Sequence, residues 1–244
     1  MPLALINQAQ SAIYFISNAG HLQRQQLVWL TDTAWQSMQA RTWDATAHAV
    51  LAHWRAQQLP VVVTRQRGDA APDVVCVGLP APSQWGKRKL AFSVSMSDIA
   101  NTSPCPTLAQ VADGHNWQVA AMALNAALTQ RGVQARVHGS FAWQQVTALA
   151  YLHPHSDLDL HLPVTSLAQA SQVLDVLKQS SVSNLETAVP LPRLDGELIF
   201  PGGQAVAWRE LGQLLSGQVA QVLVKDLLTV RLVDLADLRG LCKP

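Results

Sequence analysis

Charge is scarce in this sequence of 244 residues. Asp, Glu, Lys and Arg make up only 14% of it, whereas 49% of the residues are hydrophobic. Disordered chains show the reverse balance, which excludes disorder as the main state. The 17 basic and 16 acidic residues leave a net charge of +1, too little for the strongly basic face that duplex-DNA binders use. We therefore expect a folded protein without a nucleic-acid partner.

Long hydrophobic runs and paired cysteines are missing as well. No apolar stretch is long enough to span a bilayer, and residues 1–10 have neither the cationic start nor the long apolar core of a secretory signal. The three cysteines, at positions 76, 105 and 242, are far apart and form no metal-type pair. Free thiols are typical of a reducing compartment. The sequence thus predicts a cytoplasmic protein without a membrane partner.

The first part of the chain predicts a small α/β domain, which we assign to residues 1–100. Its first clear helix spans Asp44 to Gln58, because apolar residues recur there at helical spacing and Pro60 forbids continuation. Asp44 or Thr42 can cap its start. Residues 101–106 hold two prolines among small polar residues and are interpreted as a linker. Three apolar segments between the helix and the linker predict strands: 60–65, 73–78 and 90–95.

The rest of the chain, residues 107–244, predicts a second domain. It begins with a helix from Trp117 to Arg131, whose buried face we expect at positions 119, 122, 123 and 126. Alternating strands and helices of this kind indicate an α/β or α+β catalytic domain. The elements expected after the first helix are a strand at 133–138, a Gly-Ser turn that opens the segment 139–144, a loop, a strand at 157–162, a helix near 167–177, a strand at 193–200, a helix at 208–215 and a strand at 219–224.

Asp157, Asp159 and His161 occupy alternate positions of the strand expected at 157–162. Side chains alternate between the faces of a strand, so these three point one way and the leucines at 158, 160 and 162 the other. Two residues of a strand span roughly 6.6 Å, a separation at which two carboxylates can bind one hard cation or bridge two. The alternative is an exposed strand edge with two solvated carboxylates, because a bare Asp-x-Asp pair is weak evidence.

Two more acidic residues share one face of the strand expected at 193–200. We prefer Asp195 as the third metal ligand, with Glu197 as the alternative. For Glu197 the alternative interpretation is a surface ion pair with Arg193, in which it would not bind the metal. Gly196, on the other face, suits a place where another backbone or a ligand comes close.

Histidines near the acid strand raise a zinc site as another hypothesis. The residues concerned are His153, His155 and His161. Two histidines spaced by one residue can bind a transition metal together with carboxylates. A third nitrogen or thiolate ligand has no obvious place in this pattern. We therefore prefer the interpretation that His153 and His155 shape the loop before the acid strand.

An apolar strand that leads into Gly139-Ser140, with an acid pair on the next strand, resembles the nucleotidyltransferase superfamily of the polymerase-β type. The resemblance implies an α+β fold, with a mixed sheet flanked by helices, preceded by the smaller N-terminal domain. It also implies that the Gly-Ser turn approaches a triphosphate. The carboxylates implied to be catalytic and to hold one or two Mg²⁺ ions are Asp157, Asp159 and Asp195, with Glu197 as a further candidate ligand.

Several motifs in order resemble one family more closely, the malonate decarboxylase holo-acyl-carrier-protein synthases, or phosphoribosyl-dephospho-CoA transferases. The resemblance covers most of the chain. It implies an enzyme that transfers the prosthetic group from 2′-(5″-triphosphoribosyl)-3′-dephospho-CoA to a serine of the apo acyl-carrier subunit of malonate decarboxylase, releasing pyrophosphate. The motifs are Pro60-Val-Val-Val-Thr-Arg65, Gly78-Leu-Pro-x-Pro82, Gly86-Lys87-Arg88, Gly139-Ser140-x-x-Trp143-Gln144-x-x-Thr147, Ser156-Asp-Leu-Asp-Leu160, Pro192-Arg-Leu-Asp-Gly-Glu197 and Ala205-Val-Ala-Trp208-Arg-Glu210.

Phosphate-binding candidates complete the expected site. The Gly139 backbone and Ser140 could bind the triphosphate with no bulky side chain in the way. The basic candidates are Arg193 and Lys225, with Lys87 and Arg88 on a basic rim of the N-terminal domain. Ordinary surface charge is the alternative for each of them.

Two other functions stay open at this stage. The same fold could act on another protein, an RNA or a small molecule, or the chain could be a catalytically silent module that only binds a nucleotide or a carrier protein. Intact Asp157, Asp159 and Asp195 argue against the silent module.

Overall fold

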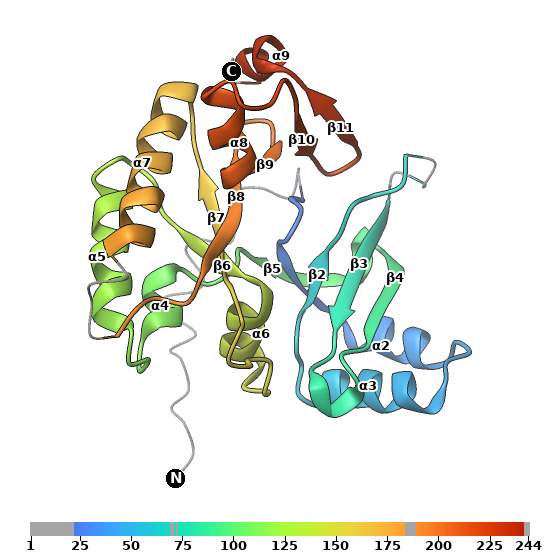
Figure 1. Cartoon of the computed structure of the whole chain (residues 1–244). Coiled ribbons are helices and arrows are strands. Elements are labelled where there is room, and N and C mark those ends of the chain that lie inside the picture. The colour runs from blue at the N-terminus through green and yellow to red at the C-terminus, as the bar shows by residue number, and fades with distance from the viewer. Residues whose placement is uncertain (1–21, 69–70, 72, 184–188, 242–244) are drawn as a thin grey trace.

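The computed structural model describes residues 22–68, 71, 73–183 and 189–241. Within this part the chain forms two β-sheets, each with helices and a hydrophobic core of its own (Figure 1). We call the described residues up to 106 the N-terminal lobe, and those from 107 onward the C-terminal lobe. The α+β class expected from the sequence is confirmed.

The N-terminal lobe is a five-stranded sheet in the order β4-β3-β2-β1-β5 with two helices. Every neighbouring pair in it is antiparallel, so the lobe is α+β and the α/β expectation for it was wrong. The reason is that β3 and β4 follow each other through a short connection, which allows only antiparallel pairing. The elements are β1 (Leu27–Leu30), α2 (Asp32–Gln39), α3 (Ala45–Ala56), β2 (Val61–Val63), β3 (Val74–Pro80), the 3₁₀ turn η1 (Ser83–Trp85), β4 (Lys89–Ser95), η2 (Met96–Asp98) and β5 (Ile99–Ser103).

Helix α3 follows the expectation closely. The Asp44 side chain caps it by accepting a hydrogen bond from the Ala47 N–H at 2.9 Å. Its apolar face, which includes Leu51 and Trp54, is fully buried. By contrast, part of the expected linker is strand β5, which pairs with β1. This edge strand is polar and half-exposed, so no apolar alternation announced it.

The C-terminal lobe is a six-stranded mixed sheet in the order β11-β10-β9-β8-β7-β6. Strands β7 and β8 are parallel and joined by the crossover helix α7, whereas the other neighbours are antiparallel. Figure 1 shows α5 and α7 lying together along the sheet. The elements are α4 (Leu108–Ala112), α5 (Gln118–Thr129), β6 (Arg136–His138), α6 (Gly139–Thr147), β7 (Leu158–Pro163), α7 (Leu167–Ser183), β8 (Leu194–Ile199), β9 (Ala205–Ala207), α8 (Trp208–Leu215), β10 (Val222–Lys225), β11 (Val230–Val233) and α9 (Leu235–Gly240).

Two local expectations in this lobe were wrong. Helix α5 buries Ala121, Leu124 and Leu128, whereas Val119 is 84% exposed. The helix is apolar on nearly every side, so its periodicity did not single out one face. Gly139 and Ser140 form the first turn of helix α6 instead of a separate turn, and the loop expected after Gln144 begins at Ala148. Buried Phe141, Ala142 and Trp143 anchor the helix.

None of the helices in the described part of the chain combines the length and the apolarity needed to cross a bilayer.

Gly196 allows β7 and β8 to pair closely. Its φ of +132° lies in a region open mainly to glycine, and a Cβ there would come within 2.0 Å of the Leu160 carbonyl oxygen. Leu160 is also its register partner across the parallel pair. The backbone contact can form only where position 196 has no side chain.

We expect Gly196→Ala to destabilise the fold severely, by on the order of 4 kcal/mol or more, because backbone atoms of a central strand must move. Gly203→Ala is the control, since Gly203 also has a positive φ but a Cβ there would meet nothing within 4 Å. It should cost only about 1 kcal/mol. Urea unfolding of both variants measures the difference, and equal costs would contradict the packing argument.

Candidate functional site

The acid strand is built as its alternation predicts. Leu158, Leu160 and Leu162 on β7 are fully buried, while Asp159 on the opposite face is half-buried. Asp157 comes directly before the strand. Parallel pairing sets Asp159 beside Asp195, the second residue of β8. Asp157, Asp159 and Asp195 therefore lie near one another where the two strands begin.

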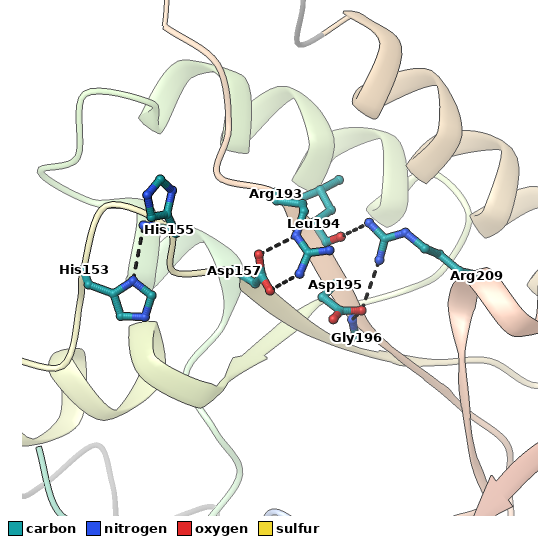
Figure 2. A network of polar contacts seen from close by, with 8 residues as sticks. All are labelled: His153, His155, Asp157, Arg193, Leu194, Asp195, Gly196 and Arg209. Carbon is teal, nitrogen blue, oxygen red and sulfur yellow. Dashed lines mark hydrogen bonds and ion pairs between the residues drawn. The ribbon is translucent and has the colours of Figure 1, made fainter. Parts of the chain in front are cut away.

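Arginines hold two of the three carboxylates (Figure 2). Arg193 donates to both oxygens of Asp157, with its Nε at 2.7 Å. Arg209 donates to Asp195 at 3.2 Å and also to the Leu194 carbonyl at 2.6 Å. The hydrogen bonds from Arg193 lower the pKa of Asp157. The surface pair between Arg193 and Glu197, considered from sequence, is not formed.

Asp159 is the carboxylate that no partner neutralises. Within the described residues its side chain receives no hydrogen bond or ion pair. Burial raises its pKa to about 6, and the nearby charges of Asp195 and Asp157 contribute. The carboxylate lies against the α-carbon of Gly139, where a Cβ would come within 2.0 Å of its Oδ2. Gly139, with φ +65°, thus allows the first turn of α6 to meet the acid strand.

A hard cation fits the chemistry of this donor set but not its present arrangement. Three carboxylates close together supply the oxygen ligands that Mg²⁺ prefers, and the raised pKa of Asp159 shows that their negative charge is incompletely balanced. In the part of the chain that the structure describes, however, no three His, Cys, Asp or Glu side chains are arranged to hold a metal ion. Asp157 and Asp195 would have to turn from their arginines to become ligands.

Glu197 has different partners from those expected of a metal ligand. Its buried carboxylate accepts hydrogen bonds from Arg24 of the N-terminal lobe and, at 3.1 Å, from Lys225 on β10. Burial raises its pKa, but the charges of Arg24 and Lys225 outweigh this and leave the pKa below its ordinary value. Glu197 therefore anchors the segment before β1 to the second sheet.

The histidines do not gather around one point. His161 is half-buried against His138, with ring centroids 5.5 Å apart, and desolvation lowers the pKa of His161 to about 3, which keeps it neutral. His153 and His155 lie together on the loop before β7, where the His153 Nδ1 accepts the His155 N–H at 3.2 Å (Figure 2). The loop-shaping interpretation agrees with this contact.

The expected phosphate-binding residues divide into three groups. Gly139, Ser140, Lys87 and Lys225 line a cavity of about 710 Å³ between the lobes. Arg193 lies outside the lining of this cavity, on Asp157. Arg88 also lies outside the lining and pairs with Asp44 at the start of α3.

Sequence reasoning missed two arginines at the site. Arg209 was inside a quoted motif, after Trp208, over whose ring it also stacks at 4.4 Å. Nothing in the sequence pointed to Arg24, because its partner Glu197 lies 173 residues away.

Comparison with known families identifies the chain. A family model described as the C-terminal domain of phosphoribosyl-dephospho-CoA transferase MdcG matches residues 107–236, and one described as the N-terminal domain matches residues 23–104. The chain belongs to the phosphoribosyl-dephospho-CoA transferase family. The resemblance seen in its motifs is thereby confirmed.

Curated proteins named phosphoribosyl-dephospho-CoA transferase are similar to this family member over most of its length. One from Xanthomonas campestris pv. campestris (strain 8004) is 40% identical over 204 residues, covering 83% of this chain and 89% of the relative. One from Bradyrhizobium diazoefficiens is 32% identical over 213 residues, covering 86% and 89%. No solved structure matched the chain. The polymerase-β type of fold stays a prediction.

Removing the Asp159 charge should stabilise the metal-free transferase at neutral and alkaline pH. A carboxyl whose pKa is raised by folding favours the folded state at low pH and loses that contribution as pH rises toward 6. In EDTA, Asp159→Asn should raise the free energy of unfolding at pH 8 by on the order of 1–2 kcal/mol and change it little at pH 4. Asp175→Asn, on the exposed face of α7, should do neither. If Asp159→Asn were less stable than the wild type at pH 8, the conclusion that the charge of Asp159 is unbalanced would be wrong.

Neutralising Glu197 should have the opposite effect. Glu197→Gln leaves Arg24 and Lys225 facing each other with their shared anion removed, so we expect a loss on the order of 2–4 kcal/mol at pH 7. Because folding lowers the pKa of Glu197, this difference from wild type should vanish as pH falls through that lowered pKa, below about 4.5. Glu210→Gln, at an exposed position on α8, is the matched control. Denaturant unfolding at pH 7 and pH 3.5 tests it, and a pH-independent loss would argue against the ion cluster.

Proposed function

We propose that this protein transfers the phosphoribosyl-dephospho-CoA group from 2′-(5″-triphosphoribosyl)-3′-dephospho-CoA to a serine hydroxyl of the apo acyl-carrier subunit of malonate decarboxylase, with release of pyrophosphate. The observation that carries the proposal is the unneutralised Asp159, set between two other carboxylates and against the first residue of α6. It occurs in a chain that matches both family models. Names of the relatives support the donor, and the acceptor follows from the family resemblance.

The reaction makes one bond to phosphorus and breaks another. The serine oxygen bonds to the α-phosphorus, the bond from that phosphorus to the oxygen bridging to the β-phosphate breaks, and pyrophosphate leaves with the bonding electrons. The serine proton must go to a base. We assign this role to Asp195, because its side chain is 42% exposed and within reach of an incoming carrier, whereas Asp159 lies deeper.

Positive groups must balance the charge that builds up on the phosphates. Mg²⁺, held by Asp157, Asp159 and Asp195 as one or two ions, would offset the charge of the transferring group and the pyrophosphate. With Asp157 and Asp195 as metal ligands, Arg193 and Arg209 would be free to donate to phosphate oxygens from the rim of the site.

The start of helix α6 supplies the groups that contact the triphosphate itself. Gly139 and Ser140 begin the helix with backbone N–H groups that no side chain caps, and helix N-termini favour anions. Lys225 lies on the same cavity but shares its charge with Glu197. We assign Gly139 and Ser140 to phosphate binding. Lys225 instead balances the charge of Glu197 beside the cavity.

Neutralising the acid strand should abolish transfer. Asp157→Asn and Asp159→Asn keep the size of the side chain but remove the charge a hard cation needs, so each should lower turnover at least about a hundredfold. The double variant should be little worse than either single one, because both residues serve one site. Intact-mass analysis of the carrier after incubation with enzyme, donor and Mg²⁺ measures transfer.

A thermal readout separates the metal from the chemistry. Mg²⁺ should raise the Tm of the wild-type protein, because an ion that binds only the folded state stabilises that state. It should have little effect on the Tm of Asp159→Asn, which lacks the charge of one ligand. Asp175→Asn should behave as wild type in both assays. Turnover within a few fold of wild type in either strand variant would refute the site, and labelling of the carrier by plain ATP but not by the triphosphoribosyl donor would refute the donor.

A further inference from the structure

A cleft between the lobes begins beside the acid strand and extends over the first sheet. It encloses about 710 Å³, within the ~300–1,000 Å³ usual for ligand pockets. Strands β2, β3 and β4 of the N-terminal lobe line one side, and the start of α6 with Trp143 and Tyr151 lines the other. The Tyr151 hydroxyl donates to the Pro80 carbonyl at 2.6 Å, a contact that ties the two walls together.

The lining combines an apolar surface with unpaired positive charge. Val62 and Ala91 contribute apolar side chains from the first sheet, and Trp143 contributes its ring from α6. Arg65, Lys87 and Lys89 also line the cleft, and none of them forms an ion pair among the described residues.

A single acidic residue, Asp226, lines the cleft within the described part of the chain. Its carboxylate accepts hydrogen bonds from the Leu228 and Thr229 N–H groups and from the Thr229 hydroxyl. One negative charge offsets at most one of the three positive charges, so the cleft keeps an excess of positive charge that suits an anion carrying an apolar chain.

The cleft and the carboxylates meet at the start of α6, next to His138, the register partner of Asp159. Gly139 and Ser140 line the cleft, and the other side of Gly139 rests on Asp159. The outer side of the carboxylates is open, because Arg193, Asp195 and Arg209 have side chains 66%, 42% and 43% exposed (Figure 2). A long donor can therefore extend from Gly139 into the cleft while the acceptor protein approaches from the exposed side.

We propose that this interlobe cleft binds the coenzyme A arm of the donor, meaning its pantetheine chain and 5′-diphosphate. The inference rests on the proposed function for the identity of the donor. The apolar wall of β2, β3 and β4 packs against the pantetheine chain, and Lys87, Lys89 and Arg65 supply charge for the diphosphate. The N-terminal lobe is then the part of the protein that distinguishes this donor from a plain nucleoside triphosphate.

Dephospho-CoA is the probe, because it carries this arm and lacks the triphosphoribosyl group. Its binding to the full-length chain is measured by calorimetry at two salt concentrations. Ala91→Phe places a bulky ring in the cleft from an exposed position on edge strand β4, and should weaken binding at least tenfold. Ala100→Phe makes the same change at an exposed alanine on the opposite edge strand, β5, and should leave binding unchanged.

A charge variant tests the same cleft without a steric change. Lys87→Met should weaken dephospho-CoA binding several fold and reduce its salt dependence. Its backbone strain stays the same, because both residues carry a side chain at the left-handed φ of +55°. Lys178→Met, at an exposed position on α7, should have no effect.

The outcomes separate the cleft from the reaction. If the wild-type protein transfers the group but Ala91→Phe and Lys87→Met bind dephospho-CoA normally, the cleft assignment is wrong and the proposed function stands. Absence of saturable dephospho-CoA binding by the wild-type protein, or a loss of carrier binding alone in Ala91→Phe, would also overturn it. If dephospho-CoA binds in the cleft but no transfer occurs with the full donor, the proposed reaction fails and the arm site stands.

Discussion

The close parallel pairing of β7 and β8 is the constraint on which the site depends. It brings the backbone of Leu160 so close to Gly196 that a side chain at position 196 would clash with it. Because side chains alternate along both strands, that register puts Asp159 beside Asp195 and, one step further, His161 beside Glu197. A shift by one residue would turn the carboxylates toward the core and the leucines toward solvent. Carboxylates separated by a 17-residue helix in the sequence thus share one site.

Electrostatics around this register follow from how deeply each acid lies. Asp157 and Asp195 are near the surface, where Arg193, directly before β8, and Arg209, on α8, can reach them. Glu197 is deeper and is neutralised by two cations, one from each lobe. Asp159 lies between them and has no such partner, so burial and the neighbouring negative charges raise its pKa. Of these four acids, Asp159 alone forms no ion pair with a described residue, and it is also the one that lies against the start of α6, where a triphosphate would bind.

The same arrangement assigns complementary roles to the two lobes. The C-terminal lobe holds the carboxylates, and the N-terminal lobe contributes most of a cleft that reaches them through Gly139 and Ser140. Arg24, Tyr151 and the backbone hydrogen bond from Gln66 to Leu227, at 2.7 Å, hold the lobes together around that cleft. A donor with one reactive end and one long arm needs both a charged centre and an extended surface. Only the contact between lobes provides them side by side.

Local pattern was enough for much of this protein. The leucine and aspartate alternation at 157–162 predicted both the strand and the faces of its residues, and the Asp44 cap and Pro60 predicted helix α3 within two residues, because these signals act over neighbouring positions. The family followed from motifs spread along the chain.

Partnerships between distant segments depended on the tertiary structure. Arg88 binds Asp44 while its neighbour Lys87 lines the cleft, and Glu197 binds Arg24 instead of joining the other acids. The polar edge strand β5 formed because β1 offered free hydrogen-bonding groups, and α5 buried the face that α7 and the sheet covered. In each case the contact that formed depended on which charge or surface another part of the chain brought within reach. The residues next to it in the sequence do not indicate that distant partner.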